Sequence, residues 1–134
     1  MKTSIVALAS AVLWTGAVQA QAPAPADGKI LFAKNCAACH QANGRGIPGA
    51  FPALVASPVA IGPADAAAEV LLKGRGGMPD FSTSLDDADI AAVLTYARSS
   101  WGNRAPPITG AEVTMRRAAL QVAPAGDSRF GNKH

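Results

Sequence analysis

The sequence is poor in aromatic residues and in cysteine. Aromatic residues make up 5% of the 134 residues, and only two residues are cysteines. These two, Cys36 and Cys39, are so close in the chain that a disulfide between them would constrain the unfolded state little. A structural disulfide is therefore excluded as a useful source of stability. A small domain with few large apolar side chains therefore needs another source of stability.

Other absences narrow the class of protein. No segment alternates between apolar and polar residues as a strand does, and no internal repeat is present, so the expected fold is all-α. No long basic run with interleaved aromatic residues is present, which argues against nucleic-acid binding. The formal net charge of +3 is modest. It is compatible with a surface that docks another protein.

The first twenty residues have the pattern of a secretory signal. Lys2 gives a basic start, an apolar run follows from Ile5 to Val18, and a peptidase site ends at Ala20. The run of about 14 residues is shorter than the roughly 20 that span a bilayer. We therefore predict a signal peptide over residues 1–20 and a soluble periplasmic protein. An uncleaved signal that anchors the protein to the membrane is the alternative.

A compact unit is expected over residues 27–101, behind a flexible lead-in at residues 21–26. Asp27 is a good N-cap for its first helix, in which Gly28 and Phe32 share one face. A glycine costs a helix about 1 kcal/mol relative to alanine. Its presence there indicates the close approach of another backbone.

Two more helices are predicted after an irregular Gly- and Pro-rich segment at residues 41–63. The shorter covers residues 64–73 and the longer covers residues 85–99, where Ser84 and Asp87 resemble a capping box. Its apolar stripe contains Ile90, Val93, Leu94, Ala97 and Trp101. Residues 102–134 form an extension with one possible helix, from Thr109 to Gln121, and a disordered end.

The stretch "KNCAACHQANGRG" allows three chemistries: a redox dithiol, a metal site or covalent haem attachment. A thioredoxin-like dithiol belongs beside alternating strands and helices, and no strands are predicted. A structural zinc site needs four ligands. Cys36, Cys39 and His40 supply three, and His134 lies in the predicted disordered end. Haem attachment is the favoured interpretation.

Cys-x-x-Cys-His is the attachment signature of c-type haem. Two thioethers hold one edge of the porphyrin, and His40 is placed below the iron as the proximal ligand. A covalent haem c also adds a large apolar body to a thin core. For the sixth ligand we favour Met78, in the Gly-rich loop "GRGGMPDF", over Met115, whose expected role is to fill a gap in packing. A His/Met pair raises the reduction potential and fills both axial positions.

With these motifs in place, the chain resembles a class I cytochrome c over residues 28–101. Gly28 and Phe32 match the first-helix pair that this family packs against its last helix. "GRGIPGAFPAL", "GRGGMPDF" and "IAAVLTYARSSWGN" are also similar to cytochrome c subunits of membrane-bound bacterial dehydrogenases. The resemblance implies a small all-α fold wrapped around one covalent haem c, held by Cys36 and Cys39, with His40 and Met78 as axial ligands.

The resemblance also implies that His40 donates its other ring N–H to a backbone carbonyl in the next loop. Pro48 is the favoured acceptor and Pro52 the alternative. Two further sets of residues could contact haem propionates. Arg45 and Arg75 are one set, with solvated surface charge as the ordinary alternative. Tyr96 and Trp101 are the other, for which core packing is the favoured role.

The expected function is electron transfer without enzymatic activity. The protein would shuttle electrons between a dehydrogenase or quinol-oxidising complex and an oxidase or another cytochrome. Membrane contact would come only through such a complex or an uncleaved signal. A dedicated subunit of a membrane-bound dehydrogenase is the alternative, because Arg116 and Arg117 give the extension a basic helix for docking. A haem protein with a labile distal site is a third reading, although Asp80 near Met78 is a better turn or surface residue.

Overall fold

The computed structural model describes residues 26–126, and in this part of the chain helices follow one another without any extended strand. The predicted all-α fold is confirmed. The predicted signal, the lead-in before residue 26 and the end of the chain from residue 127 lie outside the described residues. The helices are α1 (Gly28–Asn35), α2 (Ala37–His40), α3 (Ala64–Lys73), α4 (Asp87–Ser99) and α5 (Gly110–Ala119).

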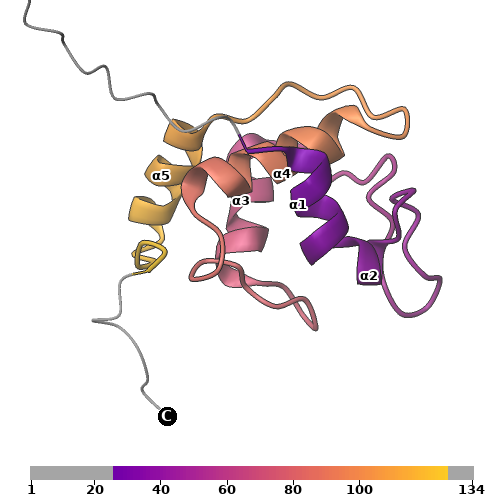
Figure 1. The fold of residues 1–134 in the computed structure, drawn as a ribbon, viewed down its shortest axis with the longest axis horizontal. Coiled ribbons are helices and arrows are strands. Elements are labelled where there is room, and N and C mark those ends of the chain that lie inside the picture. Colours follow the sequence, from indigo (N-terminus) through magenta and orange to yellow (C-terminus); the bar gives the residue numbers. More distant parts are fainter. Residues whose placement is uncertain (1–25, 127–134) are drawn as a thin grey trace, which may run out of the picture.

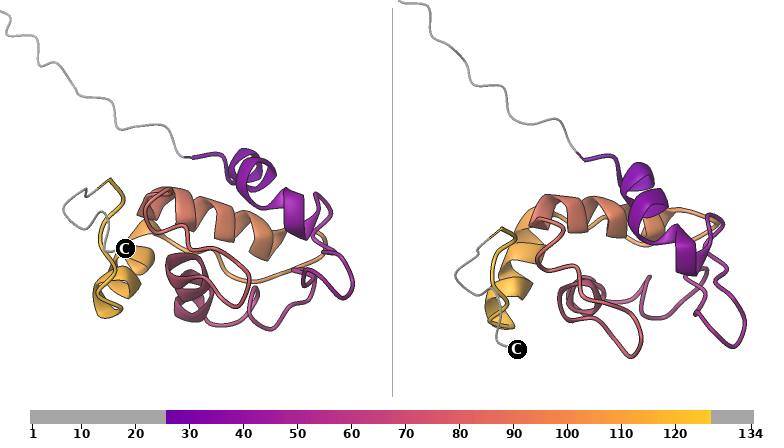
Figure 2. Two further views of the ribbon diagram at one scale, coloured as in Figure 1. Left: turned by 90° about the horizontal axis from the view of Figure 1, so that it is seen from below. Right: turned by 60° about the horizontal axis from the view of Figure 1, so that its bottom comes forward.

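The longest helix, α4, is the centre of the arrangement (Figure 1). Helix α1 crosses one side of it, and α5 lies at its N-terminal end, as the views in Figure 2 show. The crossing of α1 over α4 is close because Gly28 has no side chain. A Cβ atom at Gly28 would lie 2.9 Å from Cβ of Tyr96 and would overlap the carbonyl oxygen of Ala92. The predicted close approach of another backbone to Gly28 is confirmed.

Side-chain caps fix where three of the helices begin. The Asp27 carboxylate accepts hydrogen bonds from the backbone N–H groups of Lys29 and Ile30, as predicted. Thr109 and Glu112 form the predicted capping box of α5. The prediction for α4 was wrong, because the N-cap is Asp86 and not Ser84. A carboxylate one residue before the helix accepts the hydrogen bond from the N–H of Asp89.

The C-terminal extension packs against the rest of the fold. Val113 on α5 is fully buried, and Ile108 just before α5 is buried too. Both belong to the same hydrophobic core as Phe32 and Ile90. Helix α5 is in contact with α3 and α4. The described part of the extension is therefore integrated into one core with the preceding helices.

The two arginines of α5 pair with carboxylates of the same molecule, which weakens their predicted role as a basic docking surface. Arg116 forms an ion pair with Glu69 on α3, and its guanidinium is 3.9 Å from a carboxylate oxygen of Asp65. Arg117 is 4% exposed and forms an ion pair with Asp87 on α4. Sequence reasoning placed both side chains at the surface because a pair of arginines on a short helix usually lies there.

Among residues 26–126, no helix is long and apolar enough to cross a membrane.

The Gly28 contact gives a direct test of the α1–α4 crossing. Gly28→Ala should lower the free energy of unfolding by about 1–3 kcal/mol, because the added methyl group pushes on a backbone that cannot yield cheaply. Helix propensity alone predicts the opposite sign, a gain of about 1 kcal/mol. Denaturant titration measures the difference, with Lys29→Ala on the exposed side of α1 as the control. A more stable Gly28→Ala variant would contradict the close crossing.

Candidate functional site

A cavity of about 560 Å³ opens beside α1, α3 and α4, and its wall is mostly apolar. Its wall holds most of the side chains predicted to handle the cofactor. These are Cys36, Cys39, His40, Arg75 and Met78. The structure therefore brings together residues that are more than forty positions apart in the chain. Phe32 from α1 and Leu94 from α4 form part of the apolar lining.

The two cysteines reach the cavity because the chain breaks its helix at Cys36. Cys36 ends α1 with its N–H donating to the carbonyl of Phe32, and α2 begins at the next residue. Both thiols are free and half-buried. Burial, with a smaller contribution from Cys39, raises the pKa of the Cys36 thiol to about 11. A redox dithiol needs a lowered thiol pKa, so this environment opposes the dithiol alternative.

His40 is buried and oriented by one hydrogen bond. Its Nδ1 lies 2.9 Å from the carbonyl oxygen of Pro52. A ring N–H at Nδ1 donates to that oxygen, which leaves the lone pair of Nε2 available to a metal. The acceptor is therefore Pro52, and the favoured choice of Pro48 was wrong.

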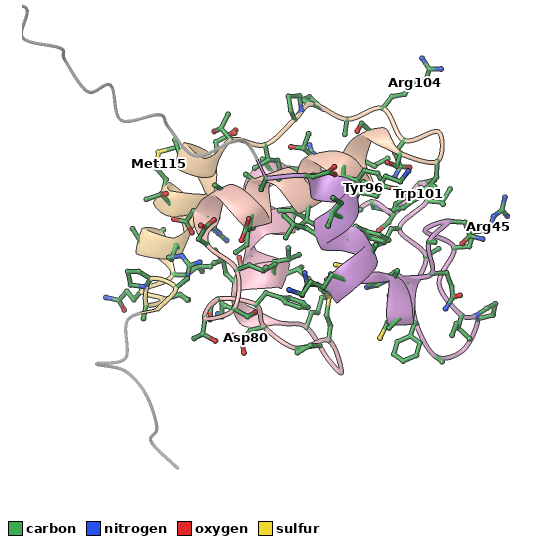
Figure 3. All side chains as sticks on the ribbon, in the orientation of Figure 1. Arg45, Asp80, Tyr96, Trp101, Arg104 and Met115 are labelled. Carbon is green, nitrogen blue, oxygen red and sulfur yellow. The ribbon has the colours of Figure 1, made fainter. Side chains whose placement is uncertain are left out.

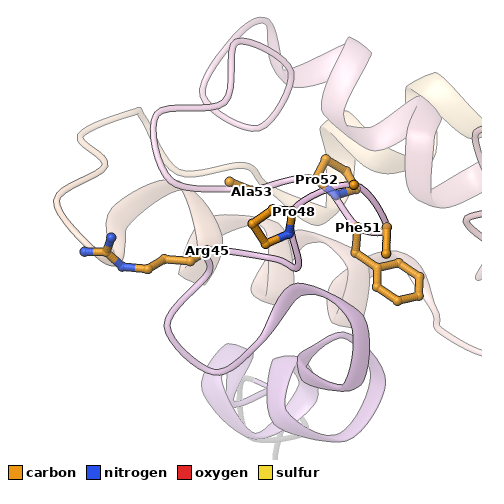
Figure 4. Close-up of a pocket in the computed structure, with 7 residues that line it drawn as sticks. Arg45, Pro48, Phe51, Pro52 and Ala53 are labelled. Carbon is orange, nitrogen blue, oxygen red and sulfur yellow. The ribbon is translucent and has the colours of Figure 1, made fainter.

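The reason is the fold of the loop after α2. A backbone bridge joins Ile47 to Phe51, and Pro48 lies within the turn that the bridge closes. Pro52 follows the bridge, where the chain returns to His40. Pro48 and Pro52 both line a smaller hollow of about 380 Å³ (Figure 4). The sequence alone could not tell which of the two prolines accepts the hydrogen bond from His40, because that depends on how the turn between them closes.

A cluster of three aromatic rings packs against the loop that follows α2. The Phe32 and Trp101 ring centroids are 5.1 Å apart, and Tyr96 lies 5.5 Å from both. Figure 3 shows Tyr96 and Trp101 side by side. The indole N–H of Trp101 donates to the carbonyl of Ala42. Neither Tyr96 nor Trp101 lines the cavity, which favours the packing role over contact with a propionate.

The Trp101 ring also explains a glycine in the loop. Gly44 has a φ of +68°, and a Cβ there would lie 2.6 Å from Cδ2 of Trp101. Its carbonyl accepts hydrogen bonds from the N–H groups of Leu54 and Val55. The turn at "NGRG" thus lies flat against Trp101 and brings the chain back toward His40.

Met78 is presented by a short loop after α3. Its N–H and carbonyl pair with those of Arg75, closing a tight turn. The side chain is partly buried and lines the cavity. Met115 is 65% exposed on the outer side of α5 (Figure 3). Its predicted role as a gap-filling residue was wrong. Of these two methionines, only Met78 lies at the cavity.

The remaining predicted polar residues differ in their positions. Arg75 is exposed and lines the cavity, whereas Arg45 lines only the smaller hollow and points away from it (Figure 4). The exposed Asp80 accepts a hydrogen bond from the hydroxyl of Ser82 at 2.7 Å, as expected of a turn residue.

Sequence reasoning missed the buried Arg98, which holds the loop before α3. Arg98 is 3% exposed. Its guanidinium donates hydrogen bonds to three backbone carbonyl oxygens. The acceptors are Ala60 and Gly62 before α3 and Pro106 in the segment before α5, each at 2.8 Å. Ala60 lines the cavity. Burial lowers the pKa of Arg98. No sequence signal distinguishes this arginine from an exposed one near a helix end.

The donor set fits a c-type haem. Two thiols and an imidazole lie on the wall of an apolar cavity whose lining also includes a thioether. Among residues 26–126, no group of three His, Cys, Asp or Glu side chains is gathered to hold a metal ion by itself. A cofactor that brings its own four nitrogen ligands needs only the two axial groups from the protein.

Comparison with known proteins agrees with this chemistry. The family described as cytochrome c oxidase, cbb3-type, subunit III, matches residues 23–96. The chain is 36% identical over 116 residues to a cytochrome c-552 of Thermus thermophilus, covering 71% of this chain and 77% of that protein. It is 37% identical over 82 residues to cytochrome c6 of Synechocystis, covering 57% of this chain and 68% of that protein.

A longer class of relatives is matched only in part. The chain is 35% identical over 104 residues to the cytochrome c subunit of a quinone alcohol dehydrogenase from Gluconacetobacter polyoxogenes. The match covers 67% of this chain and 22% of that subunit. The chain therefore spans about a fifth of the length of these dehydrogenase subunits.

Arg98→Leu should lower the free energy of unfolding by about 3 kcal/mol or more. Each of the three carbonyls that loses its partner costs about 1–3 kcal/mol if it stays buried. Thermal or denaturant unfolding measures the loss. Arg104→Leu, at an exposed arginine six residues later, is the control and should change stability by less than about 0.5 kcal/mol. Equal stability of the two variants would show that Arg98 does not hold the loop.

Proposed function

Because the chain belongs to the class I c-type cytochromes, which carry electrons on covalently bound haem c, we propose that it shuttles electrons in the periplasm. Its donor would be a dehydrogenase or a quinol-oxidising complex, and its acceptor an oxidase or another cytochrome. The observation that carries this proposal is the single cavity lined by Cys36, Cys39, His40 and Met78.

Each of these residues has a defined task. Cys36 and Cys39 hold the haem through thioethers, and both cysteines of the chain belong to this one motif, so one haem is expected. His40 and Met78 would be its two protein ligands. The hydrogen bond from His40 to the Pro52 carbonyl fixes the ring tautomer and makes Nε2 a better donor to iron. Bound haem c supplies a reversible one-electron couple.

The proposed His/Met pair separates electron transfer from ligand chemistry. Two protein ligands leave no open position for a substrate, and a thioether raises the reduction potential. Asp80, the acidic residue near Met78, is exposed and accepts a hydrogen bond from the hydroxyl of Ser82. It is therefore poorly placed as an acid or base, which weakens the alternative of a catalytic haem site.

The charge around the cavity favours an anionic docking surface on the partner. The segment from Gly28 to Ala64 contains Lys29, Lys34 and Arg45 but no aspartate or glutamate. Asp27 directly precedes this segment, and the other acidic residues follow later, beginning at Asp65. This asymmetry gives the cysteine-bearing part of the molecule a positive potential, which would steer an acidic partner toward it.

A second candidate is a dedicated cytochrome subunit of a membrane-bound dehydrogenase. The observation that favours it is the similarity to the cytochrome c subunits of quinone alcohol dehydrogenases. Pull-down of the native protein from its host membranes tests it. A dehydrogenase subunit recovered in equimolar amount supports the dedicated subunit, and recovery of the cytochrome alone supports the free carrier.

Replacing Met78 tests the axial ligand. Met78→Leu should abolish the Met-to-iron charge-transfer band of the oxidised protein and allow rapid carbon monoxide binding to the reduced protein, because the sixth position is opened. Met115→Leu is the matched control, since Met115 is 65% exposed on α5. It should leave both signals unchanged. A Met78→Leu variant with the parental band would remove Met78 from the ligand set.

The charge asymmetry predicts how small redox reagents react. Oxidation of the reduced protein by ferricyanide, an anion, should slow as salt is added, because screening weakens the attraction. Arg45→Glu should slow this reaction about two- to threefold at low salt. Arg104→Glu makes the same charge change away from the cavity loops and should have a smaller effect. Equal effects of the two variants would show that the reaction senses only net charge.

A further inference from the structure

Arg117 is bound on nearly every side although it lies in the C-terminal extension. Its guanidinium donates to the Asp87 carboxylate at 2.7 Å, and to the carbonyls of Ser82 at 2.9 Å and Ala123 at 2.6 Å. A longer contact of 3.5 Å reaches the carbonyl of Leu85. Three of these four acceptors lie within residues 82–87, so Arg117 attaches α5 to this one segment.

That segment begins at Ser82, the last residue of the loop that carries Met78. The loop leaves α3 at Gly74, whose N–H donates to the carbonyl of Val70. It returns to α3 at Phe81, whose N–H donates to the carbonyl of Leu71 at 2.7 Å. Ser82 comes next and is buried. Its hydroxyl binds Asp80 and its carbonyl binds Arg117.

Met78 therefore lies between two anchors, in a turn closed by its backbone pairing with Arg75, and its side chain packs against the hydrophobic core. A Cβ atom at either Gly76 or Gly77 would have no atom of another residue within 4 Å. Because the tip of the loop at these glycines is open, the place of the Met78 turn at the cavity also depends on where the loop begins and where it ends. The beginning is fixed by α3, and the end is fixed by α3 and Arg117 together.

We propose that Arg117 is a positioning residue for Met78: by binding the carbonyl of Ser82, it holds the end of the 74–82 loop so that the thioether stays at the cavity. This inference rests on the proposed role of Met78 as axial ligand. It gives the extension after residue 101 a task in the redox site, although no residue of α5 lines the cavity.

Loss of the guanidinium should loosen the loop without removing any cavity residue. The carbonyl of Ser82 would be left without this donor, and the Asp87 carboxylate would lose its ion-pair partner. The loop end would then move more freely, and Met78 would leave the iron more often. A competing ligand that binds only when Met78 has left should detect this directly.

The test uses the haem-loaded full chain at a temperature where circular dichroism shows every variant folded. Arg117→Leu should speed carbon monoxide binding to the reduced protein about tenfold or more, and weaken the Met-to-iron band of the oxidised protein. Arg117→Lys keeps the charge, and its rate of carbon monoxide binding should lie closer to that of the parent.

Arg98→Leu is the matched control: it also removes a buried arginine from backbone carbonyls, but those carbonyls lie outside the Met78 loop. Its rate should stay within about twofold of the parent.

A parental carbon monoxide rate in Arg117→Leu would overturn the proposal, and so would an equal acceleration in Arg98→Leu, which would indicate general loosening. If Arg117→Leu does not fold, Arg117→Gln decides instead, because glutamine keeps a donor but cannot make all the bonds of the guanidinium: accelerated binding supports the proposal, and a parental rate overturns it. The parent protein separates this failure from that of the proposed function. A parent without a Met-to-iron band loses Met78 as ligand, whereas a normal parent with an unchanged Arg117→Leu variant loses only the positioning role.

Discussion

The cavity beside α1, α3 and α4 is the constraint on which the rest of the structure depends. Its volume is about 560 Å³, whereas the cavity left by removing one buried leucine side chain already costs about 3–5 kcal/mol. A small unit with an apolar space of this size has little core left to hold it, so we expect it to need a group that fills the space. The covalent haem c of this family supplies the missing core, and in our proposal Cys36, Cys39 and His40 tie it to one wall.

Two buried arginines hold the irregular segments of this small protein in place by binding their backbone carbonyls. The irregular segments before α3, α4 and α5 present carbonyl groups to the interior, and these need donors. Arg98 and Arg117 each satisfy several of them at once, because the guanidinium carries five N–H groups in a planar fork. Arg98 joins the loop before α3 to the segment before α5, and Arg117 joins α5 to the end of the Met78 loop. The loops around the cavity are thus fixed by these hydrogen bonds as well as by packing against the core.

Local signals in the sequence predicted much of this fold. The caps at Asp27 and Thr109, the contact at Gly28 and the attachment motif depend on residues that are neighbours in the chain, or on one residue type. The wrong predictions concern contacts that depend on how the chain folds back on itself. Pro52 was ranked below Pro48 because the turn between them decides which carbonyl faces His40. Arg117 was placed at the surface because three of its four acceptors are 30 or more residues earlier in the chain.

The most direct test of the account is whether the chain folds without its haem. Cys36→Ala with Cys39→Ala removes both attachment points and leaves the hydrophobic core of the helices intact. Far-UV circular dichroism of this variant, purified free of haem, should show a largely unfolded chain without a cooperative thermal transition. A haem-free variant with parental helix content and a cooperative transition would contradict the account, because the cavity would then not need to be filled.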